Sequence, residues 1–393
     1  MRPARSERVL VQINGKLTPI PLISIFSFHL NRLKMKATQL VSVLFVALLS
    51  APAWSQGVTT PRTPSPAATV MQTVGISTVT VHYSRPSVKG RAIWGDLVPY
   101  GWNVQAFGNQ KSAPWRAGAN ENNVIEFSHA AKVEGQAVPA GKYGLFFVIN
   151  KDNSGEVILS KDTRSWGSFW YEPARDQLKA NIQIRTIPAT ELLTFDFTNL
   201  TKNSAELVLN WEKKQFPVKV EFAVDDIVMA NVADELKGPI GFNWQGYSSA
   251  ANYALQNNLD SEKALSWIDQ AIDQNKSFAT LNTKADLLKK TGKTAEADKL
   301  RTEAMGMATE AELNAYGYQL LAGGQQDEAI KIMILNTERH PDSANAFDSL
   351  GETYATQGDK VNAIKSFKKS LTMKPNAGTK ANSEKFLKQL GAM

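Results

Sequence analysis

The stretch "FDSLGETYATQGDKVNAIKSFKKSLTMKP" (347–375) places apolar and small side chains at the period of amphipathic helices, about 3.6 residues. It predicts a hairpin of two helices. Ala363 is the small residue at which the two helices would touch, and Pro375 closes the unit. The preceding unit closes at Pro341, 34 residues before Pro375. This fixed spacing predicts an array of repeated hairpins.

The helical period begins after Asp225, and four segments then repeat at intervals of 32–34 residues. The small residue of the hairpin contact recurs in each segment, at Ala264, Ala297, Ala329 and Ala363. The final stretch "NSEKFLKQLGAM" (382–393) is apolar on one side only, as a helix that caps the end of an array is. Residues 225–393 therefore read as helical repeats with a C-terminal capping helix.

The last two units resemble the tetratricopeptide family. The matching residues are Leu313, Tyr316, Gly317, Leu320, Gly324, Ala329, Met333 and Pro341 in one unit, and Phe347, Leu350, Gly351, Tyr354, Gly358, Ala363, Phe367 and Pro375 in the other. The first two units depart from the pattern. Asn252 stands where the first helix usually has a small residue, and Arg301 stands where an aromatic is usual. The resemblance implies an α-solenoid that takes a protein or peptide partner.

By this resemblance, the first helix of each hairpin lines the concave side of the solenoid. The side chains expected to face this groove are Ser249, Tyr253, Gln256, Asn282, Asp286, Lys289, Asn314, Tyr318, Asn345, Asp348 and Glu352. They lack the Lys/Arg set with which a tetratricopeptide clamp holds a peptide's C-terminal carboxylate, so that mode is disfavoured. The alternative is that the repeats mainly pack on the preceding domain.

Between residues 70 and 224 the dominant pattern has a period of two. Apolar residues alternate with more polar neighbours in four runs: Val79, Val81 and Tyr83; Leu193, Phe195 and Phe197; Leu207, Leu209 and Trp211; Val218, Val220 and Phe222. A single apolar face is what half-buried antiparallel strands need. "KYGLFFVIN" (142–150) is apolar on both faces and predicts a central strand. The pattern predicts a β-sandwich of about 150 residues.

Several motifs of this region occur in a familiar order. They are "YSRPSVKGRAIWGDLVPYG" (83–101), "WRAGANENNVIEF" (115–127), "VPAGKYGLFF" (138–147), "WG" (166–167) and "LNWEKKQFPVKV" (209–220). Together they resemble domain of unknown function family 2911, which is often exported and sometimes followed by tetratricopeptide repeats. The resemblance implies no established activity. The whole chain is thus predicted to be an all-β sandwich followed by an all-α tetratricopeptide-like solenoid.

The chain departs from the family pattern by the insert "WNVQAFGNQKSAP" (102–114), which precedes Trp115. Its Trp102, Asn103, Gln105, Phe107 and Asn109 have no evident core to fill. We expect the insert to enlarge or cover whatever lies beside Trp115.

The N-terminal region reads as a leader. "MKATQLVSVLFVALLSAPAWSQG" (35–57) has a cationic start, an apolar run of about ten residues and small residues at Ala53 and Ser55. The run is too short to span a bilayer. We predict a signal peptide over 35–55, cleaved after Ser55, and export to the periplasm or the outside of the cell. Residues 1–34 are interpreted as an extension from a mis-assigned start, and residues 56–69 as a Pro/Thr/Ser-rich tether.

The formal net charge of +7 belongs mainly to this leader. Residues 1–55 hold seven Lys/Arg and one acid, which leaves 37 bases against 36 acids in the rest. Because the chain after residue 55 is nearly neutral, it creates no strong electrostatic field that would attract polyanions. Nucleic acid is therefore not expected as a partner. The absence of Cys excludes disulfides, thiolate metal sites and cysteine nucleophiles. No metal or cofactor motif is present, and we predict neither.

Two loops carry the candidate ligand-binding residues of the β domain. They are Arg85, Arg91 and Trp94 in the first loop and Trp115, Arg116, Asn120 and Glu121 in the second. Guanidinium groups bind carboxylates and indoles stack, so the set suits a small polar, anionic or carbohydrate ligand. The alternative is structural: an Arg paired with Glu121 or Glu126 would tie the loops to the sheet, and Asn120 would shape a turn.

Catalysis has few candidates. His82 and His129 are the histidines of the β domain, and nothing in the pattern places them together. We predict no catalytic residue and a non-enzymatic binding or assembly role, with a protein on the repeats and a ligand on the sandwich loops. One rival hypothesis is a hydrolase that uses Glu121 or Glu126 with His129 or Arg116. The other is a structural β domain whose repeats are the only functional part.

Overall fold

The computed structural model describes residues 10–13, 16–19 and 64–393. The chain divides into two compact units, 1–61 and 62–393. In the first unit, β1 (Leu10–Ile13) pairs antiparallel with β2 (Lys16–Pro19). The predicted signal peptide and its cleavage site lie outside the described residues, as does the predicted tether as far as residue 63. The first strand of the second unit begins at Ala67, within the segment assigned to the tether.

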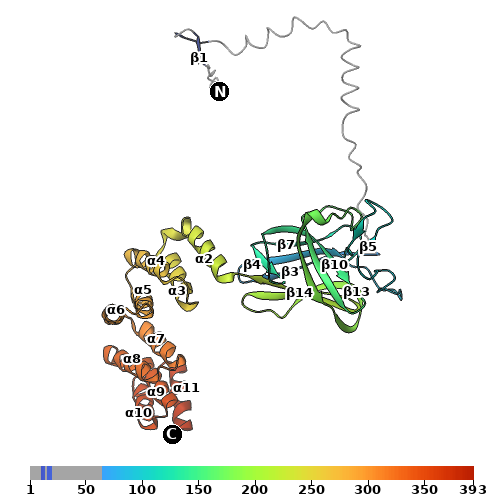
Figure 1. The fold of residues 1–393 in the computed structure, drawn as a ribbon. Coiled ribbons are helices and arrows are strands. Elements are labelled where there is room, and N and C mark those ends of the chain that lie inside the picture. Colours follow the sequence, from blue (N-terminus) through green and yellow to red (C-terminus); the bar gives the residue numbers. More distant parts are fainter. Residues whose placement is uncertain (1–9, 14–15, 20–63) are drawn as a thin grey trace, which may run out of the picture. The chain divides into compact units, whose positions relative to one another are not determined.

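Two antiparallel sheets make up the strand-rich part of the second unit (Figure 1). One sheet has six strands in the order β12-β11-β10-β7-β4-β3, and the other has four in the order β13-β14-β8-β9. The six strands are β3 (Ala67–Val74), β4 (Ser77–Ser84), β7 (Asn123–Phe127), β10 (Gly141–Ile149), β11 (Ser154–Ser160) and β12 (Asp176–Gln183). The four are β8 (Ala131–Val133), β9 (Gln136–Val138), β13 (Arg185–Thr198) and β14 (Ser204–Phe222).

One apolar core takes the inward side chains of both sheets. Val79 and Val81 of β4 are fully buried in it, as are Leu207 and Leu209 of β14. These residues belong to the alternating runs, which are rich in the β-branched and aromatic side chains that suit a pleated surface. The predicted all-β sandwich is confirmed.

Strand β10 is buried on both faces because the insert covers its outer side. Leu145 and Phe147 point into the core between the sheets, whereas Phe146 and Val148 join a second apolar cluster. That cluster contains Ala113 of the insert, and Trp102 packs against it. The insert itself pairs β5 (Asn103–Val104) with β6 (Ser112–Ala113). The expectation that Trp102 has no core to fill is therefore wrong.

Ten α-helices follow the sandwich within the described residues. They are α2 (Val224–Glu235), α3 (Trp244–Gln256), α4 (Ser261–Gln274), α5 (Phe278–Lys290), α6 (Thr294–Met307), α7 (Glu310–Ala322), α8 (Gln326–Arg339), α9 (Ala344–Gln357), α10 (Lys360–Thr372) and α11 (Ala377–Gln389). Short 3₁₀ turns occur at Pro173–Arg175 and Pro239–Phe242.

Helices α3 to α10 form the four predicted hairpins, in which consecutive helices pack in pairs (Figure 1). The alanines of the hairpin contact, Ala264, Ala297, Ala329 and Ala363, are at most 1% exposed. Helix α11 caps the last hairpin through Phe386, whose ring stacks on Phe367 with centroids 5.1 Å apart. The predicted all-α repeat region is confirmed.

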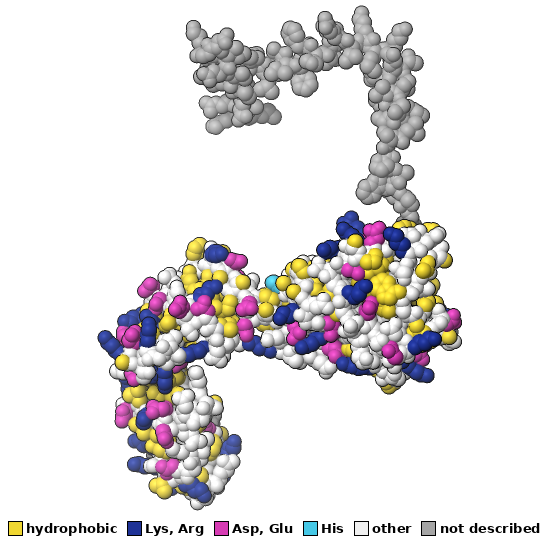
Figure 2. Space-filling view, in the orientation of Figure 1, with side chains coloured by type: hydrophobic (Ala, Val, Ile, Leu, Met, Phe, Trp, Pro, Cys, Tyr) yellow, Lys and Arg dark blue, Asp and Glu magenta, His cyan; other side chains and the backbone are white. Residues whose placement is uncertain are grey.

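Charges of both signs are interspersed over the face of residues 64–393 that Figure 2 draws. This mixture agrees with the near-balance of acids and bases outside residues 1–55. No single-sign field therefore builds up over that face.

The crossing of α9 and α10 gives a test of the repeat packing. A Cβ on Gly351 would lie 2.8 Å from ring carbons of Phe367, whereas a Cβ on Gly317 would meet the flexible end of Met333 at 2.7 Å. Overpacking costs about 1–3 kcal/mol, and the better helix propensity of alanine returns about 1 kcal/mol. We expect Gly351→Ala to lower the free energy of unfolding of the repeats by about 1 kcal/mol.

The matched control is Gly317→Ala, which we expect to be close to neutral because the methionine end can move. Urea unfolding of the full chain, followed by helical circular dichroism, measures both variants. Equal losses for the two would contradict the packing argument.

Candidate functional site

A cavity of about 540 Å³ opens among the loops of the β domain. Its wall combines residues from the first candidate loop, the insert, the second candidate loop and strand β14. Four of the predicted ligand-binding residues line it: Arg91, Trp115, Arg116 and Asn120. The expectation about the insert is confirmed, because Asn103 and Gln105 contribute to the wall. Trp211 and Ser168 also line the cavity, and no local sequence signal pointed to them.

Trp115 is fixed by both sheets. Its backbone exchanges two hydrogen bonds with Phe147 of β10, at 2.8 and 3.0 Å. Its indole stacks on that of Trp211 in β14, with centroids 5.9 Å apart and planes inclined by 10°. Trp94 packs edge-on against Trp115 at 5.6 Å. This packing holds one rigid aromatic surface in the wall of the cavity.

Trp94 supports the wall but does not line the cavity. Its indole N–H donates to Glu212 at 3.1 Å, and its ring also packs on Trp211 and Phe216. Trp94, predicted as a ligand-binding residue, thus serves in the structure as packing beneath Trp115.

Arg116 is half-buried, and burial lowers the pKa of its guanidinium from the usual value. Its Nη1 donates to the carbonyl oxygen of Asn120 at 3.0 Å, and the group lies over the ring of Phe169 at 5.2 Å. Gly167 lets this side chain approach, since a Cβ there would meet the guanidinium at 2.6 Å. No carboxylate within residues 64–393 forms an ion pair with Arg116, so the pair that the sequence suggested with Glu121 or Glu126 is not formed there.

The loop after Arg116 is held by two asparagines. Asn123 is fully buried, and its amide donates to the carbonyl oxygens of Arg116 at 3.2 Å and Ala117 at 2.8 Å. Asn120 adopts a left-handed backbone conformation with φ 65° and donates to Ser84 at 3.3 Å. Asparagine tolerates this conformation better than most residues. The expected turn role of Asn120 is present alongside its place in the wall.

The remaining cations of the first loop differ in role. Arg85 lies outside the wall and donates to the carbonyl oxygen of Leu193 at 3.0 Å and to Thr194 at 2.7 Å, so it ties its loop to β13. Arg91 is exposed at the cavity, where it donates to the carbonyl oxygens of Ser87 and Val88. Lys89 is exposed in the same wall.

The groups of the hydrolase hypothesis do not meet in this cavity. Glu126 pairs with Lys142 at 3.2 Å, and His129 contacts Ser128 at 3.0 Å. Glu121 is exposed and is not one of the lining residues. Among the described residues that line the cavity there is no Asp, Glu or His. The cavity is therefore a cationic and aromatic surface without a general acid or base of these types.

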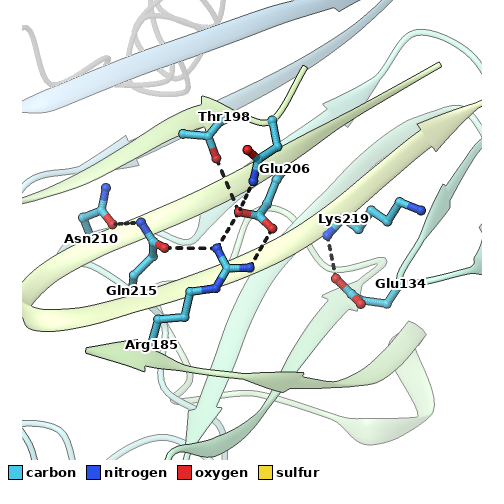
Figure 3. Close-up of polar contacts among 8 residues, drawn as sticks. Glu134, Arg185, Thr198, Glu206, Asn210, Gln215 and Lys219 are labelled. Atoms are coloured by element: carbon cyan, nitrogen blue, oxygen red, sulfur yellow. Dashed lines mark hydrogen bonds and ion pairs between the residues drawn. The ribbon is translucent and has the colours of Figure 1, made fainter. Parts of the chain in front are cut away.

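A second, more open cavity of about 730 Å³ lies beside β13 and β14. Figure 3 shows its principal polar contacts. Arg185 donates both terminal nitrogens to Glu206, at 2.7 and 2.9 Å, and also contacts Gln215. The carboxylate of Glu134 accepts from the backbone N–H of Lys219 at 2.5 Å. Arg185 and Glu206 neutralise each other, and Glu134 has a backbone donor, so this cavity is the weaker candidate for a ligand.

On the repeats, the predicted groove residues contact their neighbours. Arg301 donates to Asn282 at 2.9 Å and to Asp286 at 2.6 Å. Tyr253 donates to Asp225 at 2.8 Å, and Asn345 lies 3.5 Å from Glu310. The unusual Arg301 thus takes a structural role between two helices.

A hydrogen-bond network joins α7, α9 and α11. Tyr318 donates to Glu352, and Asn382 of α11 donates to both Glu352 and Asp348, at 2.6 and 2.8 Å. Ser383 also donates to Asp348, which is only 5% exposed. Burial raises the pKa of Asp348. Asn314 is the groove candidate whose buried side-chain oxygen has no hydrogen-bond donor within residues 64–393.

The part of the chain that the structure describes contains no group of three or more His, Cys, Asp or Glu able to hold a metal ion. Within the same residues, no helix is long and apolar enough to cross a membrane.

Comparisons with known proteins gave matches to a family model and to solved structures. Residues 65–220 match the family model described as "Protein of unknown function (DUF2911)". This match confirms the resemblance carried by the sandwich motifs, and the description names no activity. No curated protein matches the chain.

Solved structures of repeat proteins are similar to the helical part. YrrB, described as a TPR protein with an unusual peptide-binding site, is 19% identical over 41% of this chain and 83% of its own, with a TM-score of 0.25. pilF of Pseudomonas aeruginosa is 18% identical over 39% of this chain and 71% of its own, with a TM-score of 0.25. The C-terminal part of a TPR repeat-containing protein from Cytophaga hutchinsonii is 19% identical over 42% of this chain and 72% of its own, with a TM-score of 0.26.

The Arg185–Glu206 contact yields a prediction on pH. Hydrogen bonds from Arg185 hold the pKa of Glu206 below its usual value. The contact therefore stabilises the fold at pH values above the pKa that Glu206 has in the unfolded chain. This stabilisation is lost as the pH falls through the lower pKa that Glu206 has in the folded chain. Because the pair is partly exposed, we expect at most about 1 kcal/mol. Glu206→Gln should therefore lose less stability than the parent chain between neutral and strongly acidic pH, measured by thermal unfolding.

Glu172→Gln is the matched control, because Glu172 is exposed and makes no ion pair with a described residue. This variant should follow the parent chain at every pH. If the stability of Glu206→Gln also follows that of the parent chain at every pH, the contact with Arg185 does not stabilise the fold.

Proposed function

We propose that this protein is a non-enzymatic binding or assembly protein whose helical repeats hold a protein partner. The supporting observation is a set of polar contacts that joins the first helices of the hairpins in two pairs, α3 with α5 and α7 with α9. Thr283 contacts Asn252 at 3.1 Å, Asn345 contacts Glu310, and Tyr318 contacts Glu352. Side chains that neighbours already hold lose less entropy when a partner binds, which favours this face as a docking surface.

The chemistry of the face suggests the kind of partner. Arg301 neutralises Asp286, whereas the acids Asp348 and Glu352 receive neutral donors from tyrosine, asparagine and serine. Asp348 is buried, so Glu352 is the acid of this pair that the face can present. A face with amide groups and such an acid suits a peptide segment that is neutral or basic and offers its own backbone N–H groups. It does not suit the capture of a C-terminal carboxylate.

The second part of the proposal concerns the β domain, whose cavity beside Trp115 would hold a small ligand. Among small-molecule sites, volumes of about 300–1,000 Å³ are usual, and the cavity of about 540 Å³ falls within that range. A neutral carbohydrate has less support than a charged ligand. It would leave Lys89, Arg91 and Arg116 without a counter-charge in a wall that has no acid among its described residues.

We also propose that the protein acts outside the cytoplasm. The leader over residues 35–55 supports this, since its cationic start, apolar run and small residues before Gln56 form a signal-peptide pattern. Mass spectrometry of the protein purified from the periplasm or the culture medium should find Gln56 as the first residue. An N-terminus before residue 50, or retention in the cytoplasm, would overturn this part.

Binding to the repeats can be tested with a displayed random-peptide library selected against the full chain. Asn345 is exposed on the first-helix face, and Lys368 is exposed on α10. We expect Asn345→Arg to weaken the selected peptides by about tenfold or more, because it places bulk and positive charge on the face that would receive a neutral or basic peptide. Fluorescence anisotropy with the selected peptides measures the change.

The matched control is Lys368→Glu, which alters an exposed charge on a second helix and should leave affinity within about twofold. Selected peptides that bind both variants as tightly as the parent chain would place binding elsewhere and contradict the assignment to this face.

A further inference from the structure

We propose that the cavity beside Trp115 binds a small organic carboxylate, with Arg116 receiving the carboxylate and the indole and neighbouring apolar walls receiving its ring or hydrocarbon body. This inference rests on the proposal that the cavity is a ligand site, and it names the class of ligand. It is independent of what the repeats bind.

The first argument is the state of Arg116. The guanidinium is half-buried in the wall, yet its acceptor within residues 64–393 is a single carbonyl oxygen, that of Asn120. Its other N–H groups donate to no described residue, and no described carboxylate pairs with it. Buried charges in proteins are normally paired, because taking an unpaired charge out of water is costly. An anionic ligand would supply the missing charge and acceptors.

The second argument is the charge of the whole wall. Lys89 and Arg91 add two exposed cations, and the described lining residues include no acid. Clefts lined by one sign of charge concentrate ligands of the opposite sign. The mouth would thus attract an anion, and the half-buried guanidinium would hold it.

The third argument separates an organic carboxylate from a bare inorganic ion. The wall combines polar residues such as Asn103 and Ser168 with the apolar residues Leu97, Val98, Pro114 and Trp115. A volume of about 540 Å³ exceeds what a small ion fills, and these apolar groups cannot hydrate or coordinate one. Planar guanidinium groups bind carboxylates through two parallel hydrogen bonds. A carboxylate attached to a ring satisfies both halves of the wall.

The fourth argument is rigidity. Trp115 is held by backbone pairing to Phe147 and by stacking on Trp211, and the loop after it is held by Asn123. Little conformational freedom remains to be lost when a ligand enters. The site is therefore prepared for one orientation: carboxylate toward Arg116 and ring along the indole.

The test is isothermal titration calorimetry of the full chain with a panel of aryl and alicyclic monocarboxylates. Each acid is paired with its primary amide, and inorganic phosphate and neutral monosaccharides are included. We expect at least one acid to bind about tenfold or more tightly than its amide, since hydrogen bonds to charged groups are the stronger ones. Phosphate and the sugars should bind more weakly than that acid.

The insert supplies a variant that we expect to keep the fold. Gln105 lines the cavity and donates no hydrogen bond to a described side chain, whereas Gln110 lies on the same insert outside the wall. Gln105→Glu adds a negative charge at nearly the same shape and should weaken the acid about tenfold. Gln110→Glu is the matched control and should change nothing. Arg116→Gln should abolish the preference for acid over amide, with a thermal melt to verify folding.

The outcomes are distinguishable. If amides or sugars bind as well as the acids, the cavity is a ligand site but the carboxylate assignment is overturned. Phosphate binding tighter than every acid would overturn the role given to the apolar walls. If no member of the panel binds at millimolar concentration, both the carboxylate assignment and the ligand role of the cavity fail, while the proposal for the repeats stands on its own test.

Discussion

The stacking of Trp115 on Trp211, together with the backbone pairing of Trp115 to Phe147, links the cavity to both sheets of the sandwich. Phe147 belongs to the six-stranded sheet, and Trp211 belongs to the four-stranded one. The two contacts fix a loop that no regular strand includes, and Trp115 packs against the core there. Because the loop is fixed there, Arg116 and Asn120 are presented to the cavity rather than to solvent at large.

Much of the fold follows from periodicity, because periodicity reports which side of an element is buried. The runs around Val79, Leu207 and Val220 have one apolar face, and each supplies that face to the shared core. Ala264 and Ala363 mark helix contacts because only a small side chain fits where two helices cross. Both signals are local, so a single sequence carries them. That the insert covers β10 was harder to predict from the sequence, because it depends on a pairing of distant segments.

The site was only partly predictable for the same reason. Arg85 and Arg116 look alike in sequence, but Arg85 finds acceptors at residues 193 and 194 of β13, and Arg116 finds only a nearby carbonyl oxygen. The distinction depends on partners about a hundred positions away, which no local pattern encodes. On the repeats, Glu352 and Asp348 were expected to face a groove, and their contact with Asn382 depends on how the capping helix docks.

The contrast between the two cavities shows where a binding role is best supported. Beside β13 and β14, Arg185 and Glu206 neutralise each other, so the fold itself accounts for both charges. Beside Trp115, the fold brings a cation into a half-buried wall and provides rigid packing around it, yet it supplies no acid from the described residues. A half-buried cation without a counter-charge from the described residues is a local conflict, and such conflicts are expected mainly at functional sites. The unpaired, half-buried guanidinium of Arg116, rather than the size of the cavity, is therefore the observation on which the proposed carboxylate ligand rests.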